Sequence, residues 1–347
     1  MGIKVRKSIN NLQTYNVGGR SDLSSDWECF DWNESEFPPT NKVFEVVQTF
    51  YRYERYPDIT AKKLKHRLGE YTNLPPNFIE VYNGSDDGLK DIMTVFVDRN
   101  TKVLSYQPSY TQVNTFITTN TEQYKKVNIV DPLGEHRYDF DHCKDADVVY
   151  LVNPNNPTGK LISPSEIEKL LSSYPDTLFI IDEAYYEFAL HSCCEMVYSY
   201  KNLLVTRTFS KAFGLASMRL GYVMGHPDLL IHLRKIRNGK AVNALAQACG
   251  IAALSDLDYL HWRIAEMNDA KKFFMRNLPS GYDAVKSSAN FVLVKTPDSE
   301  ELLNKLKENK ILIRDRSSFE NLENCVRITI GSKKQIIKVL DVINDRV

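Results

Sequence analysis

The sequence predicts an α/β fold, with a large domain built on a mostly parallel central sheet between helices and a smaller α+β domain. In the middle of the chain, short runs rich in β-branched residues alternate with amphipathic stretches, which is typical of β–α units. These runs are apolar almost throughout, as expected for a sheet covered on both faces. The length of 347 residues also exceeds the roughly 100 to 200 residues of one typical domain.

The expected strands of the large domain each end beside polar or small residues. An amphipathic stretch at 163–175, SPSEIEKLLSSYP, predicts a helix between the first two of them. The expected strands are 148–154, 178–185, 203–209 and 220–225.

Beyond residue 255 the pattern changes to a long helical stretch followed by shorter elements. These are expected to be strand 291–296, helix 299–310, strand 311–316, strand 326–331 and a closing helix from Lys333. The first forty residues are rich in Asn, Asp and Pro and predict an arm. We therefore expect an N-terminal arm (1–40), a large domain (41–255) and a small C-terminal domain (256–347).

Composition argues against several classes of partner. The 44 basic residues balance the 44 acidic ones, so no net field favours nucleic acid or an anionic membrane. No apolar leader or spanning run is visible, so we expect a cytoplasmic location.

The six cysteines form no CxxC pair and the seven histidines no HxH or HExxH pattern. We therefore expect reduced thiols and no metal site.

Polar residues follow two of the expected strands, at the sheet edge where ligands bind in open parallel sheets. Asn155 and Asn156 lie in the turn of VNPNNPTGK, and this pattern taken alone is that of an ordinary turn. Asp182 ends a very apolar strand and Tyr185 follows three residues later. A carboxylate placed there needs a cationic or donor partner, unless it only caps the following turn.

Two further loops carry candidate binding residues. In YNGSDDGLK, Ser85 and Asp86 precede a helix expected to begin near Gly88, and such a helix start directs free N–H groups at an anion. The same pattern is also that of an ordinary capped helix. Tyr110 follows the strand KVLSY, where it could stack on a ring or simply pack at the rim.

The stretch TRTFSKAFGLASMRLGY contains Ser210, Lys211 and Arg219. A lysine in a desolvated pocket near other cations can act as an amine nucleophile toward a carbonyl, although a lysine in a turn can also lie on the surface. Pyridoxal phosphate would match the whole set of side chains. Its aldehyde could bond to Lys211, its ring nitrogen could pair with Asp182, and its ring face could stack on Tyr110. Its ring oxygen could accept hydrogen bonds from Asn156 and Tyr185. Its phosphate could be bound by Ser85, Asp86, Ser210 and Arg219.

The motifs NNPTGK, DEAYYEF, TRTFSKAFGLASMRLGY, RYPD and CVRITIG occur in the order found in one known family. The chain resembles the class I/II aminotransferases, pyridoxal-phosphate enzymes of fold type I, and is most similar to the histidinol-phosphate aminotransferases. The likeness extends over nearly the whole chain.

The resemblance implies Lys211, Asp182 and Tyr185 as catalytic residues and the cofactor contacts given above. It further implies that Tyr56 reaches the cofactor phosphate of a neighbouring subunit in a homodimer with shared active sites. Arg327, Arg314, Tyr15 and Asn33 match substrate-side positions, although Arg314 could be a surface charge and Tyr15 could merely pack the arm.

The reaction that the resemblance implies is transamination between an amino donor such as glutamate and a small phosphorylated ketone. The ketone could be imidazole acetol phosphate or dihydroxyacetone phosphate. The chain departs from the family at SDDG, NESEFPP, LASMR and RNGKAVNALAQ, and the last stretch is similar to threonine-phosphate decarboxylases. Decarboxylation of a phospho-amino acid and a catalytically silent binding protein are the alternatives.

Overall fold

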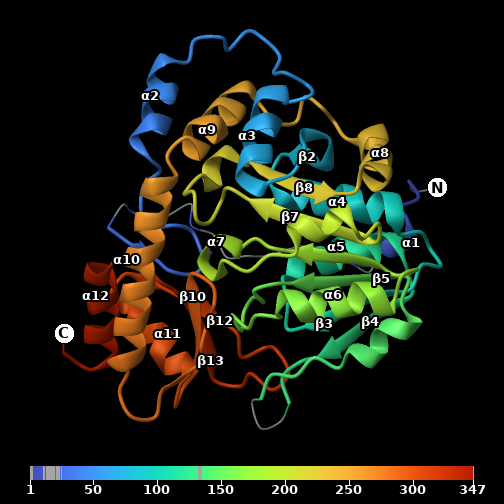
Figure 1. Ribbon diagram of the computed structural model, residues 1–347. Helices are drawn as coiled ribbons and strands as arrows, with labels where there is room; N and C mark the ends of the chain where they lie inside the picture. Colours follow the sequence, from blue (N-terminus) through green and yellow to red (C-terminus); the bar gives the residue numbers. More distant parts are fainter. Residues whose placement is uncertain are drawn as a thin grey trace.

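The structure is a computed structural model that describes residues 3–10, 12, 20, 24, 26–131 and 135–346. Its largest sheet has the strand order β2-β8-β7-β6-β5-β3-β4 (Figure 1). Strands β3 to β7 run parallel, whereas β8 is antiparallel to both of its neighbours. The bounds are β2 Ile79–Tyr82, β3 Val103–Gln107, β4 Tyr124–Asn128, β5 Val148–Val152, β6 Leu178–Asp182, β7 Leu203–Thr208 and β8 Gly221–Gly225.

Both faces of this sheet are apolar, because successive side chains of each strand enter different cores. In β5, Val149 and Leu151 face one core, whereas Val148, Tyr150 and Val152 face the other. The first core is closed by α3 (Lys62–Thr72), α6 (Pro164–Ser173) and α9 (Ala244–Leu254), and the second by α4 (Ser85–Phe96), α5 (Thr111–Asn120) and α8 (Pro227–Ile236). The predicted mostly parallel sheet between helices is thus confirmed.

A second, four-stranded sheet lies at the C-terminal end of the chain, with the order β12-β13-β10-β9 and antiparallel pairing (Figure 1). Its core also contains Phe30 from the arm. The elements are α10 Leu257–Arg276, β9 Asp283–Ala284, β10 Phe291–Lys295, α11 Ser299–Glu308, β12 Arg314–Asp315, β13 Cys325–Thr329 and α12 Lys333–Ile343.

The predicted strand at 311–316 is wrong as a single element. It is divided into β11 (Ile311–Leu312), which pairs in parallel with β1 (Glu28–Cys29) of the arm, and β12, which pairs with β13. The division arises because Phe30 of the arm bonds the carbonyl of Leu312 through its own N–H, at 2.7 Å. The arm is therefore built into the smaller sheet region. The boundaries proposed at residues 40 and 255 stay a prediction.

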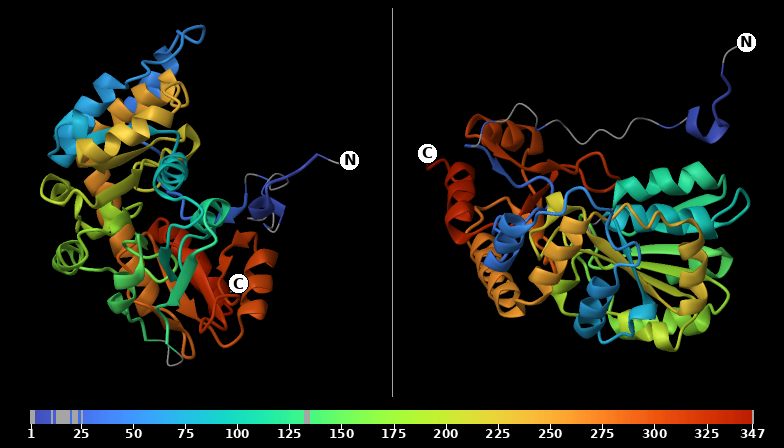
Figure 2. Two further views of the ribbon diagram at one scale, coloured as in Figure 1. Left: turned by 90° about the vertical axis from the view of Figure 1, so that its right-hand side faces the viewer. Right: turned by 90° about the horizontal axis from the view of Figure 1, so that it is seen from above.

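The remaining elements are short or peripheral. Helix α1 lies against α5, where Arg6 donates to the carbonyl oxygen of Thr119 at 2.9 Å, and α2 packs on α9 (Figures 1 and 2). No helix in the described ranges is long and apolar enough to cross a membrane. The bounds are α1 Lys7–Asn10, α2 Asn41–Thr49 and α7 Tyr186–Ala189, with short 3-10 helices at Pro76–Phe78, Phe140–Asp145, Cys194–Tyr198 and Ala216–Met218.

Candidate active site

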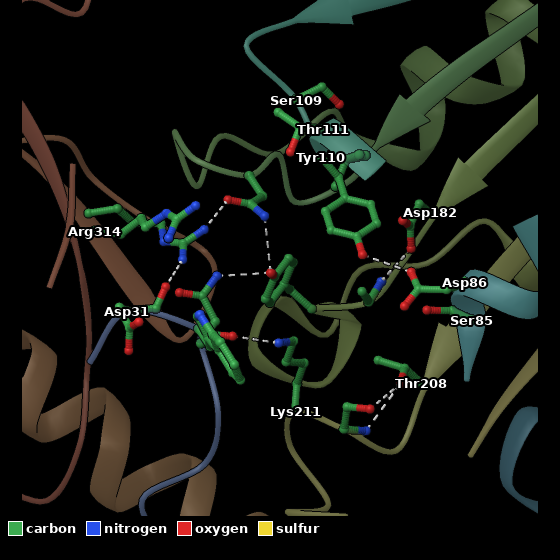
Figure 3. Close-up of a pocket in the computed structure, with 18 of the residues that line it drawn as sticks. Asp31, Ser85, Asp86, Ser109, Tyr110, Thr111, Asp182, Thr208, Lys211 and Arg314 are labelled. Atoms are coloured by element: carbon green, nitrogen blue, oxygen red, sulfur yellow. Dashed lines mark hydrogen bonds between the residues drawn. The ribbon is translucent and has the colours of Figure 1, made fainter. Parts of the chain in front are cut away.

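A cavity of about 280 Å³ lies where the carboxyl ends of β5, β6 and β7 meet the arm and the smaller sheet. Figure 3 shows Asp182, Asp86 and Ser85 on one side of it, Asp31 and Arg314 on the other, and Lys211 and Tyr110 between them. The side chains come from segments far apart in the sequence, so only the tertiary fold assembles them. The position agrees with the ligand-binding edge of an open parallel sheet.

One end of the cavity is built to hold an anion. Helix α4 begins at Ser85, three residues earlier than the sequence predicted, so the first-turn N–H groups of Ser85 and Asp86 lie at the cavity. Arg219 lies beside them, 3.4 Å from Oγ of Ser210 and 3.3 Å from Oδ2 of Asp86. Ser210 and Arg219 are thus brought to the helix start, as the sequence predicted.

Two glycines leave the room that this end of the cavity needs. Gly84 has φ +83°, and a Cβ there would lie 2.6 Å from Nη2 of Arg219. A Cβ at Gly221 would lie 2.3 Å from the backbone nitrogen of Ser85. Only glycine therefore lets β8, α4 and the guanidinium of Arg219 approach so closely. Gly84 also explains why α4 begins earlier than the sequence predicted, because its positive φ turns the chain from β2 directly into the helix.

Asp182 is 3% exposed at the end of β6. Its carboxylate accepts hydrogen bonds from Tyr150 Oη at 2.8 Å and Thr206 Oγ1 at 3.0 Å. Burial raises the pKa of Asp182 to about 6, although these two hydrogen bonds oppose the rise. The carboxylate also accepts from the N–H of Ala184 at 3.2 Å, so it caps the turn as well as lining the cavity. A cationic ring nitrogen would offset the cost of its burial.

The amine of Lys211 lies inside the cavity and not on the surface. It donates to the carbonyl oxygen of Trp32 at 2.8 Å. Burial, and after it the charge of Arg327, lower the pKa of Lys211 to about 8. At pH 7 roughly a tenth of the Lys211 amine is therefore neutral, and the neutral amine is the form that attacks a carbonyl.

A chain of hydrogen bonds joins the floor of the cavity to the smaller sheet. The Tyr185 hydroxyl accepts from Nδ2 of Asn33 at 2.9 Å and from Nδ2 of Asn156 at 3.3 Å. Arg327 donates to Oδ1 of Asn156 at 2.6 Å and to the carbonyl oxygen of Asp31. These four side chains, which the sequence predicted in two separate roles, therefore form one connected network.

Most of the predicted site residues meet in this cavity. Tyr110 does so too, with its hydroxyl donating to Oδ1 of Asp86 at 2.8 Å. Tyr15 lies outside the described residues, and Tyr56 is 78% exposed, away from the cavity and beside Lys240. The predicted residues that line the cavity are Asn33, Ser85, Asp86, Tyr110, Asn156, Asp182, Tyr185, Ser210, Lys211, Arg219, Arg314 and Arg327.

Nine residues of the cavity wall were not among the predicted site residues, and three of them have large side chains. These are Trp32, Arg316 and Phe319. The signal for Arg316 was present in the sequence, because Arg314 and Arg316 are two positions apart on a strand and so share a face. Trp32 and Phe319 carry no such signal, since each lies in an irregular segment.

The donor set fits a phosphorylated pyridine aldehyde. The start of α4 with Ser210 and Arg219 provides for a phosphate, Asp182 for a ring nitrogen, Tyr185 for a ring oxygen, and Lys211 for an aldehyde carbon. No group of three or more His, Cys, Asp or Glu that could hold a metal ion occurs in the described part of the chain.

Comparison with known proteins agrees with this chemistry. The family described as aminotransferase class I and II matches residues 25–343. A dihydroxyacetone phosphate transaminase of Campylobacter jejuni is 35% identical, covering 91% of this chain and 89% of the relative. A histidinol-phosphate aminotransferase of Geotalea daltonii is 32% identical, covering 97% of this chain and 98% of the relative.

The fold is also found among solved structures. A histidinol-phosphate aminotransferase of Sinorhizobium meliloti, in complex with pyridoxal-5'-phosphate, superposes with a TM-score of 0.82 at 26% identity and covers 92% of each chain. The predicted resemblance, fold type and cofactor are confirmed. The chain belongs to the class I and II aminotransferase family and is a pyridoxal-phosphate-dependent aminotransferase.

Proposed function

We propose that this enzyme moves an amino group between glutamate and a small phosphorylated ketone. The observation that carries the proposal is one cavity with an anion cradle at one end, several arginines at the other, and the Lys211 amine between them. The anion site at the start of α4 matches the cofactor phosphate, so the arginines at the other end are available to bind a second anion, on the substrate. Relatives named for dihydroxyacetone phosphate and histidinol phosphate support a phosphorylated substrate.

We assign the cofactor contacts as follows. The N–H groups of Ser85 and Asp86, with Ser210 and Arg219, bind the phosphate. Asp182 pairs with the ring nitrogen, Tyr185 and Asn156 donate to the ring oxygen, and Tyr110 packs on the ring face. When bound, pyridoxal phosphate supplies an aldehyde and an electron-withdrawing ring that stabilises negative charge at the substrate's α-carbon.

Lys211 has the central chemical role in this proposal. Its lowered pKa provides neutral amine at Nζ, which is able to take the proton from the substrate's α-carbon. Arg327 holds the anionic group of the substrate, and its bond to Asn156 fixes the guanidinium relative to the ring-oxygen donors. Asn33 and Arg314 contribute to the same wall.

The outlying Tyr56 belongs to a further part of the proposal, a homodimer with shared active sites. Tyr56 would bind the cofactor phosphate of the neighbouring subunit. Support comes from the segment around it, which exposes several large apolar side chains: Phe44, Val47, Tyr51, Tyr53 and Ile59. We also propose a cytoplasmic, biosynthetic role, which is compatible with six cysteines that form no disulfide.

A mass-spectrometric panel tests the reaction. The holoenzyme is incubated with glutamate and either dihydroxyacetone phosphate or imidazole acetol phosphate, and separately with phosphothreonine and phosphoserine. Transamination predicts transfer of the amino group from glutamate to one of the ketones. Loss of carbon dioxide from a phospho-amino acid would establish the decarboxylase alternative. Protein that acquires no visible absorption band with pyridoxal phosphate would support a silent binding protein.

A further inference from the structure

The wall of the cavity formed by the smaller sheet carries an arginine to which the proposed reaction gives no role. Arg314 and Arg316 flank Asp315, and strand alternation places both arginines on the cavity side while Asp315 is exposed. The backbone N–H of Arg316 bonds the carbonyl oxygen of Cys325 at 2.9 Å, which continues the pairing of β12 with β13. The position of Arg316 is therefore fixed by the sheet.

Arg316 adds a third guanidinium to one small surface. Arg314 lies directly opposite Arg327 in the register of β12 and β13, and Arg316, one residue beyond the end of β12, also lines the cavity. Like charges opposite one another destabilise a sheet. Three of them on one wall are therefore expected where an anion of more than one charge binds.

The charge of Arg316 reaches the centre of the site. Burial raises the pKa of Tyr185, and the charges of Arg327 and, more weakly, Arg316 oppose that rise. The guanidinium carbon of Arg316 lies 5.8 Å from the ring centroid of Phe319, which also lines the cavity. Arg316 is thus part of the cavity wall, and its charge acts on Tyr185, a residue proposed to contact the cofactor.

The two substrates of the proposed reaction differ in the anion they present. A carboxylate has two oxygens and one negative charge, whereas a phosphate monoester has three terminal oxygens and close to two charges at neutral pH. We propose that Arg316 is a specificity-determining residue, which favours a dianionic phosphoryl group over a carboxylate in this subsite. The assignment deepens the proposed function and rests on it for the identity of the substrates.

Equilibrium binding to the holoenzyme tests this assignment without turnover. The probes are glycerol 3-phosphate, a phosphate monoester with no carbonyl group, and glutarate, a dicarboxylate of glutamate's length. For Arg316→Gln we expect calorimetry to show glycerol 3-phosphate binding about 10- to 100-fold more weakly, with glutarate changed less than about 3-fold. Arg316→Lys should restore part of the affinity, and Arg99→Gln, an exposed arginine outside the cavity, serves as the matched control.

Dependence on pH separates charge recognition from a structural role. The second pKa of a phosphate monoester is about 6, so wild-type affinity for glycerol 3-phosphate should fall as the pH is lowered through that value, and the fall should be smaller in Arg316→Gln. Equal loss of both probes in the variant, unchanged binding, or no binding of the phosphate ester by the wild type would each overturn the assignment. The variant could lose affinity for glycerol 3-phosphate selectively while the wild-type enzyme fails to aminate any phosphorylated ketone. That result would refute the proposed reaction and leave the assignment of Arg316 standing.

Discussion

Strand β7 contributes to one charged region through Arg207 and is followed by a second at Lys211, and the two differ in how completely their cations are paired with protein groups. In the closed region, Arg207 is 1% exposed and donates through Nε to Oε2 of Glu183 at 2.9 Å. Its Nη2 donates to Ser192 at 2.6 Å, and its guanidinium lies 3.5 Å from the ring centroid of Tyr186. A carboxylate, a hydroxyl and an aromatic ring thus surround this one cation.

The open region begins four residues later, at Lys211. Here five basic side chains and three carboxylates line one cavity, and the amine of Lys211 bonds a backbone carbonyl and not a carboxylate. The comparison shows how the two kinds of buried cation can be distinguished. A structural arginine is surrounded by partners from its own chain, whereas a functional site has an excess of positive charge that ligands complete.

Removing the closed region's cation should produce the largest change in stability. Arg207→Ala leaves Glu183 buried without its ion-pair partner, and breaking a buried pair in this way costs about 3–5 kcal/mol. Urea unfolding of the variant should show that loss in the free energy of unfolding. A loss below about 1 kcal/mol, similar to that of Arg99→Gln, would mean that the closed region is not held by charge matching.

The closed region also contains one buried carboxyl group, Glu187, whose hydrogen bonding is incomplete. Glu187 is 2% exposed, and its hydrogen bond from Tyr71 is long, at 3.4 Å. Burial raises the pKa of Glu187 to about 7, although the charge of Arg207 opposes the rise. Between about pH 4.5 and pH 7 the folded protein keeps a proton that the unfolded chain releases, so this group makes the fold less stable as the pH rises through that window.

Glu187→Gln should remove this contribution. We compare the free energy of unfolding of the variant with that of the wild type at each pH. The difference in favour of the variant should be about 2 kcal/mol larger at about pH 8 than at about pH 5. Denaturant unfolding of both proteins at the two pH values measures the difference. An identical pH dependence in the two proteins would show that Glu187 is already ionised in the fold.

The smallest expected change in stability comes from the open region, where a substitution should affect substrate binding instead. Arg327→Gln should raise the KM for the amino donor about 30-fold, because a charge-assisted hydrogen bond to the substrate is lost, whereas cofactor affinity should stay within about 3-fold. Steady-state kinetics and cofactor titration measure the two effects. An unchanged KM, or equal losses in KM and cofactor affinity, would remove Arg327 from the role of substrate ligand.

The sequence predicted those parts of the fold whose signal is local. The strands β5 to β8 were recognisable because each contains a run of apolar residues, as expected where both faces of a sheet are buried. The pairing of Glu28–Cys29 with Ile311–Leu312 was not recognisable, since strands of two residues have no periodicity and their partners are distant in sequence. The start of α4 was misplaced because Gly84 completes the turn earlier than the apolar pattern suggests.

For the site, the sequence indicated which residues carry the chemistry but not how they are connected. Resemblance gave Asn156 a cofactor role and Asn33 and Arg327 substrate roles, whereas the tertiary fold joins all three through hydrogen bonds to each other or to Tyr185. Arg316 carried the same kind of signal as Arg314, since residues two positions apart on a strand share a face.

Reductive trapping of the cofactor tests the central claim most directly. The holoenzyme is treated with borohydride, digested and analysed by mass spectrometry, with Lys211→Ala carried through the same steps. We expect a pyridoxyl phosphate group on the peptide that contains Lys211 and on no other peptide, and no modified peptide from the variant. Modification of a different lysine in the wild type, or unchanged labelling in Lys211→Ala, would contradict the placement of the reactive amine in this cavity.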